Sequence, residues 1–335
     1  MLQTYVQSHC QLRLYQIINL VLVINLLGCM TDQKKDDLEA RQQVSQRPIN
    51  RIFASTYVLK ELAQLSLASS SNVVIEIIYP HSTQDPSLSV PDESMIKALQ
   101  DASLIILNGA RFEQGLVGIG LPRAKTLRTA QVFKQRWLTY PQTFISTHQH
   151  GVGGDHQHTG IDGHTWMDPQ LLKKQYDEIL TRLRLLDVEL DTSSVNVVYS
   201  ELSKLYIRWE EIGRKLRLYP LIGSHPAYQY LMRTLQVEMN HFNLNPDRLP
   251  NAKTLSKIEA FLSANQLDPT SSTRKQPLIW WESQPSKSVL EAYKEFKVKH
   301  VLIRPLERSP INSQGLFKEI NIDLNALEEL LHEEK

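Results

Sequence analysis

The sequence predicts an α/β fold with two similar four-stranded α/β lobes joined by one long rigid helix. Three observations lead to this prediction. After Pro48, short runs rich in β-branched and aromatic residues alternate with amphipathic stretches, as in layered α/β proteins. This alternation occurs in two successive sets. Between the sets lies a charged stretch in which apolar residues recur every three or four positions, which is typical of one continuous helix.

The first lobe is expected over residues 49–190. Its strands are predicted at residues 51–55, 73–79, 103–108 and 143–147. Amphipathic spacing predicts a helix over residues 56–67, and two further helices are expected over residues 92–100 and 169–185.

The linking helix is expected within residues 191–219. Its apolar positions are three or four residues apart: Val195, Val198, Leu202, Leu205, Trp209 and Ile212. At 1.5 Å per residue, such a helix is about 40 Å long and forms a stiff strut. The second lobe is expected over residues 220–335, with strands at 221–224, 237–242, 278–282 and 301–304, and helices at 227–234, 253–264, 286–296 and 324–332.

The N-terminus is typical of an export signal. A polar head with Arg13 precedes an apolar run over residues 17–27, which is too short to span a bilayer comfortably. The sequence Leu26-Leu27-Gly28-Cys29 resembles a bacterial lipobox, so residues 1–28 are expected to be a lipoprotein signal peptide and Cys29 the lipidation site. An ordinary cleaved signal or an uncleaved anchor is the alternative. Residues 29–48 are polar without apolar periodicity and are expected to form a flexible tether to the membrane, on its periplasmic or cell-surface side.

Charge and cysteine content narrow the class of protein. The formal net charge of +1 argues against a nucleic-acid-binding protein. The two cysteines of the chain, Cys10 and Cys29, lie in the signal and at the proposed lipid site. The body of the protein therefore has no disulfide framework and no thiolate ligand, which leaves histidines and carboxylates as metal donors.

Histidines cluster in one segment. Five of the eleven histidines are His148, His150, His156, His158 and His164. A histidine tract threaded with glycine and aspartate is typical of a metal-gathering loop, here residues 148–158, because neutral imidazole is a common metal ligand. The alternative is a solvated linker with incidental histidines.

Three candidate residues lie where a strand passes into the next helix, which is where open α/β sheets bind ligands. His164 precedes the helix expected at 169–185, His225 directly follows the strand at 221–224, and Arg304 ends the last strand. A lone histidine is more often structural than a ligand. Two histidines at element ends in separate lobes indicate a cleft between the lobes.

Several motifs occur in a fixed order. They are Ala54-Ser55, Asp85-Pro86 with Pro91, Asn108-Gly-Ala-Arg-Phe-Glu113, His164-x-Trp-x-Asp168-Pro169, Ser224-His225-x-Ala-Tyr, Pro250-x-Ala-Lys253 and Trp281-Glu282. Together they resemble the solute-binding lipoproteins of bacterial ABC transporters for zinc and manganese, over nearly all of the mature chain. The resemblance implies a protein that holds one divalent ion between its lobes, zinc first and manganese as the alternative, and passes it to an ABC permease in the membrane. The chain is expected to be a monomer.

Two of the four ligand positions implied by the resemblance are replaced. Ser87 stands where the family pattern has histidine, and Arg304 stands where the family has a carboxylate when it supplies one, whereas His164 and His225 match. Arginine keeps its proton in proteins, so a guanidinium in the cleft would oppose a divalent cation.

Three alternatives would reconcile these replacements with a solute site. His81 or Asp85, near Ser87 in sequence, supplies the missing donor. A histidine of the 148–158 loop folds over the cleft. Alternatively, Arg304 pairs with a carboxylate such as Glu282, and the cleft binds metal poorly or takes an anion or a metal complex.

A different class of function is a divergent, non-transport binding module that buffers metal through the His-rich loop or binds another solute. An enzyme is not expected, because the sequence has no His-Glu-x-x-His helix, nucleophile elbow or phosphate-binding glycine loop. Among other aromatic residues, Trp280 and Trp281 should face opposite sides of a strand, and Trp166 should pack beneath His164. His241, His300 and His332 are expected at the surface.

Overall fold

The computed structural model describes residues 49–79, 86–140, 160–265 and 275–332, together with the backbone of residues 147–149 and 155–157. The chain divides into two compact units, Met1–Ile49 and Asn50–Lys335. Every element below belongs to the second unit. The expected signal peptide, the tether and Cys29 lie outside the described residues. Within the described part, no helix is both long and apolar enough to cross a membrane.

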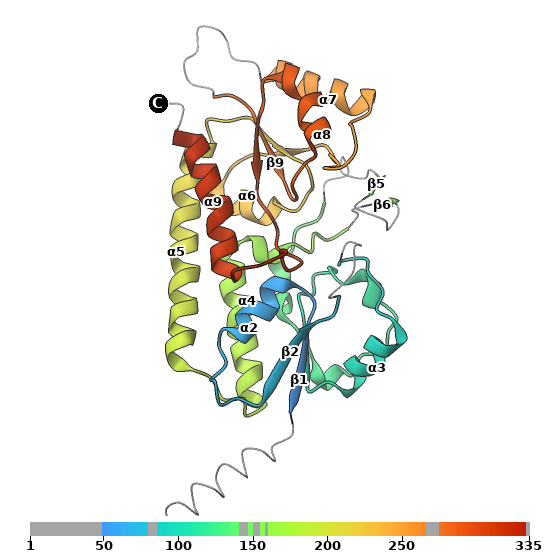
Figure 1. Cartoon of the computed structure of the whole chain (residues 1–335), viewed down its shortest axis with the longest axis vertical. Coiled ribbons are helices and arrows are strands. Elements are labelled where there is room, and N and C mark those ends of the chain that lie inside the picture. The colour runs from blue at the N-terminus through green and yellow to red at the C-terminus, as the bar shows by residue number, and fades with distance from the viewer. Residues whose placement is uncertain are drawn as a thin grey trace, which may run out of the picture. The chain divides into compact units, whose positions relative to one another are not determined.

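The first lobe is built on a parallel sheet with the strand order β2-β1-β3-β4 (Figure 1). Its strands are β1 (Asn50–Ala54), β2 (Val73–Ile77), β3 (Leu104–Leu107) and β4 (Thr126–Arg128). Its helices are α2 (Tyr57–Gln64), α3 (Glu93–Asp101) and α4 (Pro169–Leu185). Short 3-10 helices, η1 (Gln114–Leu116), η2 (Arg123–Lys125), η3 (Thr129–Arg136) and η6 (Thr165–Met167), complete it.

The fourth strand of this sheet is not the one that the sequence predicted. β4 pairs with β3 in that place, whereas residues 143–146 lie outside the described residues. β4 has three residues, with Leu127 as its one apolar side chain, so it lacks the alternation that marks a half-buried strand. Thr147 begins β5 (Thr147–Gln149), which pairs antiparallel with β6 (Asp155–Gln157) in a separate hairpin.

The second lobe repeats the topology of the first. Its parallel sheet has the order β10-β9-β7-β8, which is the second-first-third-fourth order of the first lobe read from the other edge. The strands are β7 (Leu221–Gly223), β8 (Asn240–His241), β9 (Leu278–Trp281) and β10 (Lys299–Leu302). The helices are α6 (Gln229–Leu235), α7 (Ala252–Ala264) and α8 (Lys287–Ala292), with η7 at Lys294–Phe296. The predicted fold class is therefore confirmed.

The predicted linking helix is present as α5 (Thr192–Leu216), which begins at the cap of Asp191. Val195, Val198 and Leu202 belong to the core of the first lobe. Farther along, Leu205, Trp209 and Ile212 belong to the core of the second lobe. One apolar stripe therefore anchors both lobes to the same helix, which limits how far they can move apart.

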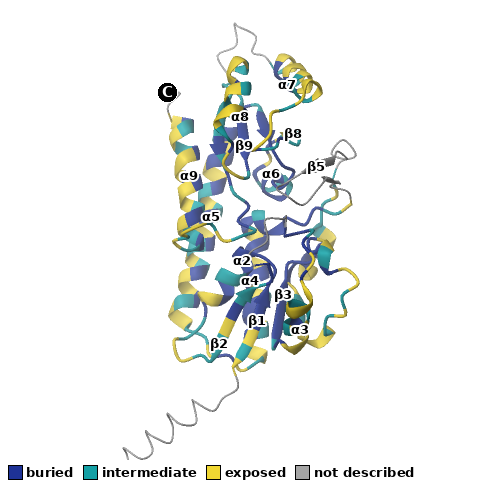
Figure 2. Ribbon diagram, turned by 45° about the vertical axis from the view of Figure 1, so that its right-hand side comes forward, coloured by how far each residue is buried: buried dark blue, intermediate teal, exposed yellow. Residues whose placement is uncertain are grey.

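A second helix also joins the lobes. α9 (Leu316–His332) lies beside α5 in Figures 1 and 2, and Arg208 of α5 donates to the Glu328 carboxylate of α9. Leu316 is part of the first core and Leu324 part of the second. The sequence predicted only residues 324–332, because two buried acids, Glu319 and Asp323, interrupt the apolar stripe of the first two turns.

Neighbouring residues of the central strands point to opposite faces of the sheet, and these strands are mostly buried (Figure 2). In β1, Ile52 belongs to one core cluster and Phe53 to another. In β9, Trp280 and Trp281 likewise belong to different clusters, as predicted. Both lobes are thus three-layered, and His225 follows the carboxyl end of a central strand of the second lobe.

Candidate functional site

The segment that carries His164 is fixed by its backbone. The Asn108 side-chain amide, just after β3, donates to the Gly163 carbonyl at 2.7 Å. From the other lobe, the Tyr230 hydroxyl donates to the Asp162 carbonyl at 3.0 Å. Gly163 itself is required by space, since a Cβ there would lie 2.8 Å from the Cα of Phe112. The position of His164 therefore depends on both lobes.

The His164 imidazole is buried between two carboxylates. Its Nδ1 lies 2.8 Å from Asp162 Oδ1, and its Nε2 lies 2.9 Å from Glu307 Oε1. Burial by itself lowers the pKa of His164, but the hydrogen bonds and charges of Asp162 and Glu307 outweigh it and raise the pKa to about 10. In this structure His164 is thus an imidazolium that bridges two anions. Trp166 packs against the ring with centroids 5.4 Å apart, as predicted.

Asp162 is the centre of this arrangement. Its Oδ1 also accepts from the His164 backbone N–H at 2.9 Å and from the Tyr140 hydroxyl at 3.1 Å. Its Oδ2 accepts from the Gln229 amide of α6 at 3.0 Å. A carboxylate that fixes one imidazole nitrogen in this way is typical of the partner that orients a metal-binding histidine.

His225 faces His164 from the second lobe, two residues after the end of β7. It is buried, and its Nδ1 lies 3.5 Å from Glu282 Oε2. Its backbone carbonyl accepts from Nδ1 of His241 at 3.0 Å. Burial lowers the pKa of His241 to about 4, so this ring is neutral at physiological pH.

The expectation that His241 and His300 are surface residues is wrong. His241 packs against the His225 backbone, and His300 Nδ1 accepts from Trp281 Nε1 at 3.0 Å. Both rings pack beside aromatic neighbours that the sequence pattern does not place near them. His332 is exposed, as predicted.

The structure brings His164 and His225 together. Their ring centroids are 5.4 Å apart, and the rings meet edge to face at 82°. Two imidazoles bound to one tetrahedral zinc ion have centroids about 5 Å apart, because each Zn–N bond is about 2 Å long. The spacing of the two rings therefore suits a shared ion.

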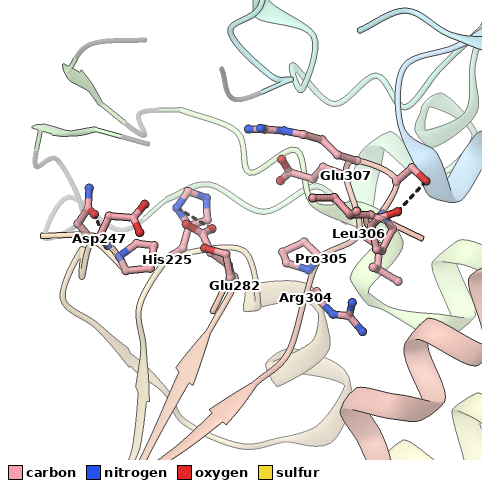
Figure 3. Close-up of a pocket in the computed structure, with 14 residues that line it drawn as sticks. His225, Asp247, Glu282, Arg304, Pro305, Leu306 and Glu307 are labelled. Atoms are coloured by element: carbon pink, nitrogen blue, oxygen red, sulfur yellow. Dashed lines mark hydrogen bonds and ion pairs between the residues drawn. The ribbon is translucent and has the colours of Figure 1, made fainter. Parts of the chain in front are cut away.

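A cavity of about 420 Å³ opens beside His225, lined by residues of the second lobe and of the loop that follows β10. Figure 3 shows His225 and Glu307 directed into it from opposite sides, with Glu282 next to His225. In the parts of the chain that the structure describes, no three His, Cys, Asp or Glu side chains are already placed to hold one metal ion. Two histidines with carboxylates at hand are nevertheless a donor set for a divalent cation.

Arg304 pairs with carboxylates, as one interpretation of the sequence had it, but they belong to α9 and Glu282 is not among them. Its guanidinium lies 2.7 Å from Asp323 Oδ1 and 3.0 Å from Glu319 Oε2, both on α9. In Figure 3 it points away from His225. The first turns of α9, which the sequence analysis missed, supply these two carboxylates. The positive charge of Arg304 is thus neutralised beside the cleft.

The other predicted site residues fall in different places. Ser87 is buried, and its carbonyl accepts from Gln114 N at 2.7 Å, so it lies against η1. His81 and Asp85 lie outside the described residues. The backbones of His148 and His156 are paired across β5 and β6, and His150 and His158 lie outside the described residues.

Sequence reasoning missed Asp162 and Glu307. Asp162 could have been predicted from the sequence, because a carboxylate two residues before a candidate ligand is a natural partner for that imidazole. Glu307 lies in a loop without periodicity, 143 residues from His164. No local pattern in the sequence connects the two.

Comparisons with known proteins place the chain in a family. The model of the family described as "Zinc-uptake complex component A periplasmic", ZnuA, matches residues 52–329. No protein with a curated description matches the chain.

Several solved structures are similar. The metal-dependent lipoprotein YcdH from Bacillus subtilis is 17% identical, with a TM-score of 0.65 over 84% of this chain and 98% of that one. The Zn(II)-bound ZnuA-like domain of Streptococcus pneumoniae AdcA is 17% identical, with a TM-score of 0.63 over 84% and 98%. The laminin-binding protein Lmb of Streptococcus agalactiae is 16% identical, with a TM-score of 0.60 over 85% and 100%. At such identities the likeness concerns the fold.

Proposed function

Because the chain belongs to the ZnuA family of periplasmic zinc-uptake components, we propose that it is an extracytoplasmic solute-binding protein. It captures a divalent metal ion between its lobes and delivers the ion to an ABC permease for import. The family is one of uptake components rather than enzymes, as the sequence predicted.

The observation that carries this proposal is the pair formed by His164 and His225. The two rings come from different lobes, are both buried, and lie 5.4 Å apart, and His225 lines an open cavity. A buried histidine pair across a cleft supports a site that an ion enters when the lobes are slightly apart.

Zinc is the proposed ion, and manganese the alternative. Imidazole donors suit zinc, whereas manganese favours sites made of oxygen ligands. One of the similar structures is described as Zn(II)-bound, which agrees with this choice.

Calorimetric titration of the full chain with zinc tests the proposal. The wild-type protein should bind one ion tightly, and the double variant His164→Ala/His225→Ala should lose that binding. Equal zinc affinity in the two proteins would show that His164 and His225 do not form the zinc site.

We also propose the division of the chain that the sequence suggests. Residues 1–28 are a lipoprotein signal, 29–48 a tether, and 49–190 and 220–335 the two lobes of a monomer, joined through 191–219. The protein is then anchored to a membrane by lipid on Cys29, on the extracytoplasmic side. Labelling cells with a radioactive fatty acid checks the anchor: the wild-type protein should become labelled and Cys29→Ala should not.

The His-rich loop is a second candidate for binding metal, as a buffer or as a donor to the cleft. The β5–β6 hairpin supports this candidate, because its register places His148 opposite His156. Deleting residues 148–158 separates the two sites. If all zinc binding vanishes with the loop, the loop and not the cleft holds the ion.

A further inference from the structure

We propose that Glu307 is a ligand of the metal ion, so that His164, His225 and Glu307 together form its protein donor set. This inference rests on the proposed function, since it concerns the same ion. It adds a carboxylate from the loop over residues 303–315, which crosses from the second lobe back to the first.

The first step is to decide which imidazole nitrogens are available. Nδ1 of His164 faces Asp162 and Nδ1 of His225 faces Glu282. Metal-binding histidines commonly direct one nitrogen to a carboxylate and the other to the metal. Nε2 is thus the nitrogen that each ring would direct to the ion, and the partner of Nε2 in His164 is Glu307.

The second step concerns distance. His164 Nε2 and Glu307 Oε1 are 2.9 Å apart. Two donors on one tetrahedral zinc ion, each about 2.1 Å from it, are about 3.4 Å apart. A displacement of about half an ångström would therefore replace the shared proton with a metal ion between the same two atoms. This is a change that a side-chain rotation supplies.

The third step is the placement of the loop. On one side of Glu307, the Pro305 carbonyl accepts from Trp166 Nε1 at 2.7 Å. The Glu307 carbonyl itself accepts from Tyr57 N at 2.9 Å, and the Tyr57 hydroxyl pairs with Ser313 at 2.6 Å. The backbone of the loop is thus fixed to the first lobe, while the Glu307 side chain keeps 17% of its surface exposed and is able to adjust.

Charge supports the same assignment. One carboxylate and two neutral imidazoles reduce the charge of a divalent ion to +1, which lowers the cost of holding it in a buried site. Arg304, three residues earlier on the same loop, is bound to Asp323 and Glu319 and does not compete for Glu307. Three protein donors leave a fourth position for water, which suits an ion that must be released again.

A cysteine substitution tests direct contact. In Glu307→Cys loaded with Co²⁺, a thiolate–cobalt charge-transfer band should appear in the near ultraviolet, because a thiolate bound to the metal gives such a band and a distant one does not. The wild-type chain, with Cys10 and Cys29, is the blank, and Glu291→Cys on the exposed surface of α8 is the matched control. Cobalt binding by Glu307→Cys without the band would overturn the assignment.

Zinc affinity provides the second measurement and separates the two proposals. Glu307→Gln should weaken zinc binding by more than about 100-fold, because loss of a supporting partner alone costs about 10–100-fold. Affinity equal to that of wild type in Glu307→Gln, with binding lost in His164→Ala/His225→Ala, would overturn the role of Glu307 and leave the proposed function standing. Unchanged affinity in both variants would overturn both.

Discussion

The two histidines of the cleft have unlike surroundings. His164 lies 2.8 and 2.9 Å from two carboxylates, and its backbone is fixed by residues of both lobes. His225 lies 3.5 Å from Glu282 and rests on the neutral ring of His241 through its carbonyl. We call the surroundings of His164 the first corner of the site and those of His225 the second corner. The first corner is held mainly by charge, and the second mainly by packing and one neutral hydrogen bond.

This difference suggests that the two corners have different roles in capture and release of the ion. A ligand whose partners are already in place loses little freedom when the ion arrives, which favours capture. A ligand that is held less tightly by its carboxylate is able to move as the lobes shift, which favours release. The predictions below test this difference in role, beginning with the largest effect.

Removing the ring should cost more stability at the first corner than at the second. His164→Ala leaves Asp162 and Glu307 without their cation, so the free energy of unfolding of the metal-free chain should fall by about 3 kcal/mol. His225→Ala should cost about 1 kcal/mol, because its contact with Glu282 is longer, at 3.5 Å. Urea denaturation at pH 7 in the presence of a chelator measures both values. Equal losses would contradict the comparison.

Acid should affect the second corner first. The pKa of His241 in the fold, about 4, is below its unfolded value near 6.5, so its contribution to stability is complete above pH 6.5 and is lost as the pH falls. The loss at pH 4 should be about 3 kcal/mol. The pKa of His164 is raised to about 10, so its contribution is complete below pH 6.5 and is lost only as the pH rises toward 10.

The variant His241→Asn isolates this effect, because its amide is still a donor for the His225 carbonyl but does not titrate. Denaturation curves of the metal-free wild type and the variant give the free energy of unfolding at each pH from 7 to 4. This free energy should fall more steeply with decreasing pH in the wild type than in the variant. If both proteins lose stability in parallel, His241 is not the group that responds.

The supporting carboxylates should differ in their effect on zinc. Asp162→Asn should weaken zinc binding about 10–100-fold, because it removes the charge that orients His164. Glu282→Gln should weaken it less than about tenfold, since Glu282 is 3.5 Å from His225. Competition with a chelator of known affinity gives both numbers. The reverse order would show that the second corner is the more firmly held.

Two glycines, one beside each histidine segment, extend the comparison to the backbone. A Cβ at Gly163 would lie 2.8 Å from the Cα of Phe112, so backbone has to move and Gly163→Ala should cost about 2 kcal/mol. A Cβ at Gly223 would lie 2.4 Å from the His241 ring, which is a side chain, so Gly223→Ala should cost about 1 kcal/mol. Thermal unfolding of the two variants provides the test, and a larger loss for Gly223→Ala would contradict it.

Much of the fold was predictable because it depends on local patterns. The apolar stripe of α5 and the strands β1 and β3 carry strong periodicity. The prediction was wrong at β4, which is too short to show a pattern, and it missed the start of α9, where Arg304 allows two acids to be buried. Both errors occur where a contact between distant segments outweighs local propensity.

The sequence by itself determined the two-lobed α/β fold, its linking helix and the two histidines that end up in the cleft, because alternation and strand-end position are local properties. Only the tertiary structure decided where Arg304 points and which carboxylates face His164. Those contacts join residues far apart in the chain, and a side chain takes its charge partner from whatever packing brings near it. The resemblance of the sequence to a known family already showed that Ser87 and Arg304 stand at two expected ligand positions. The contact of Glu307 with His164 became visible only in the fold.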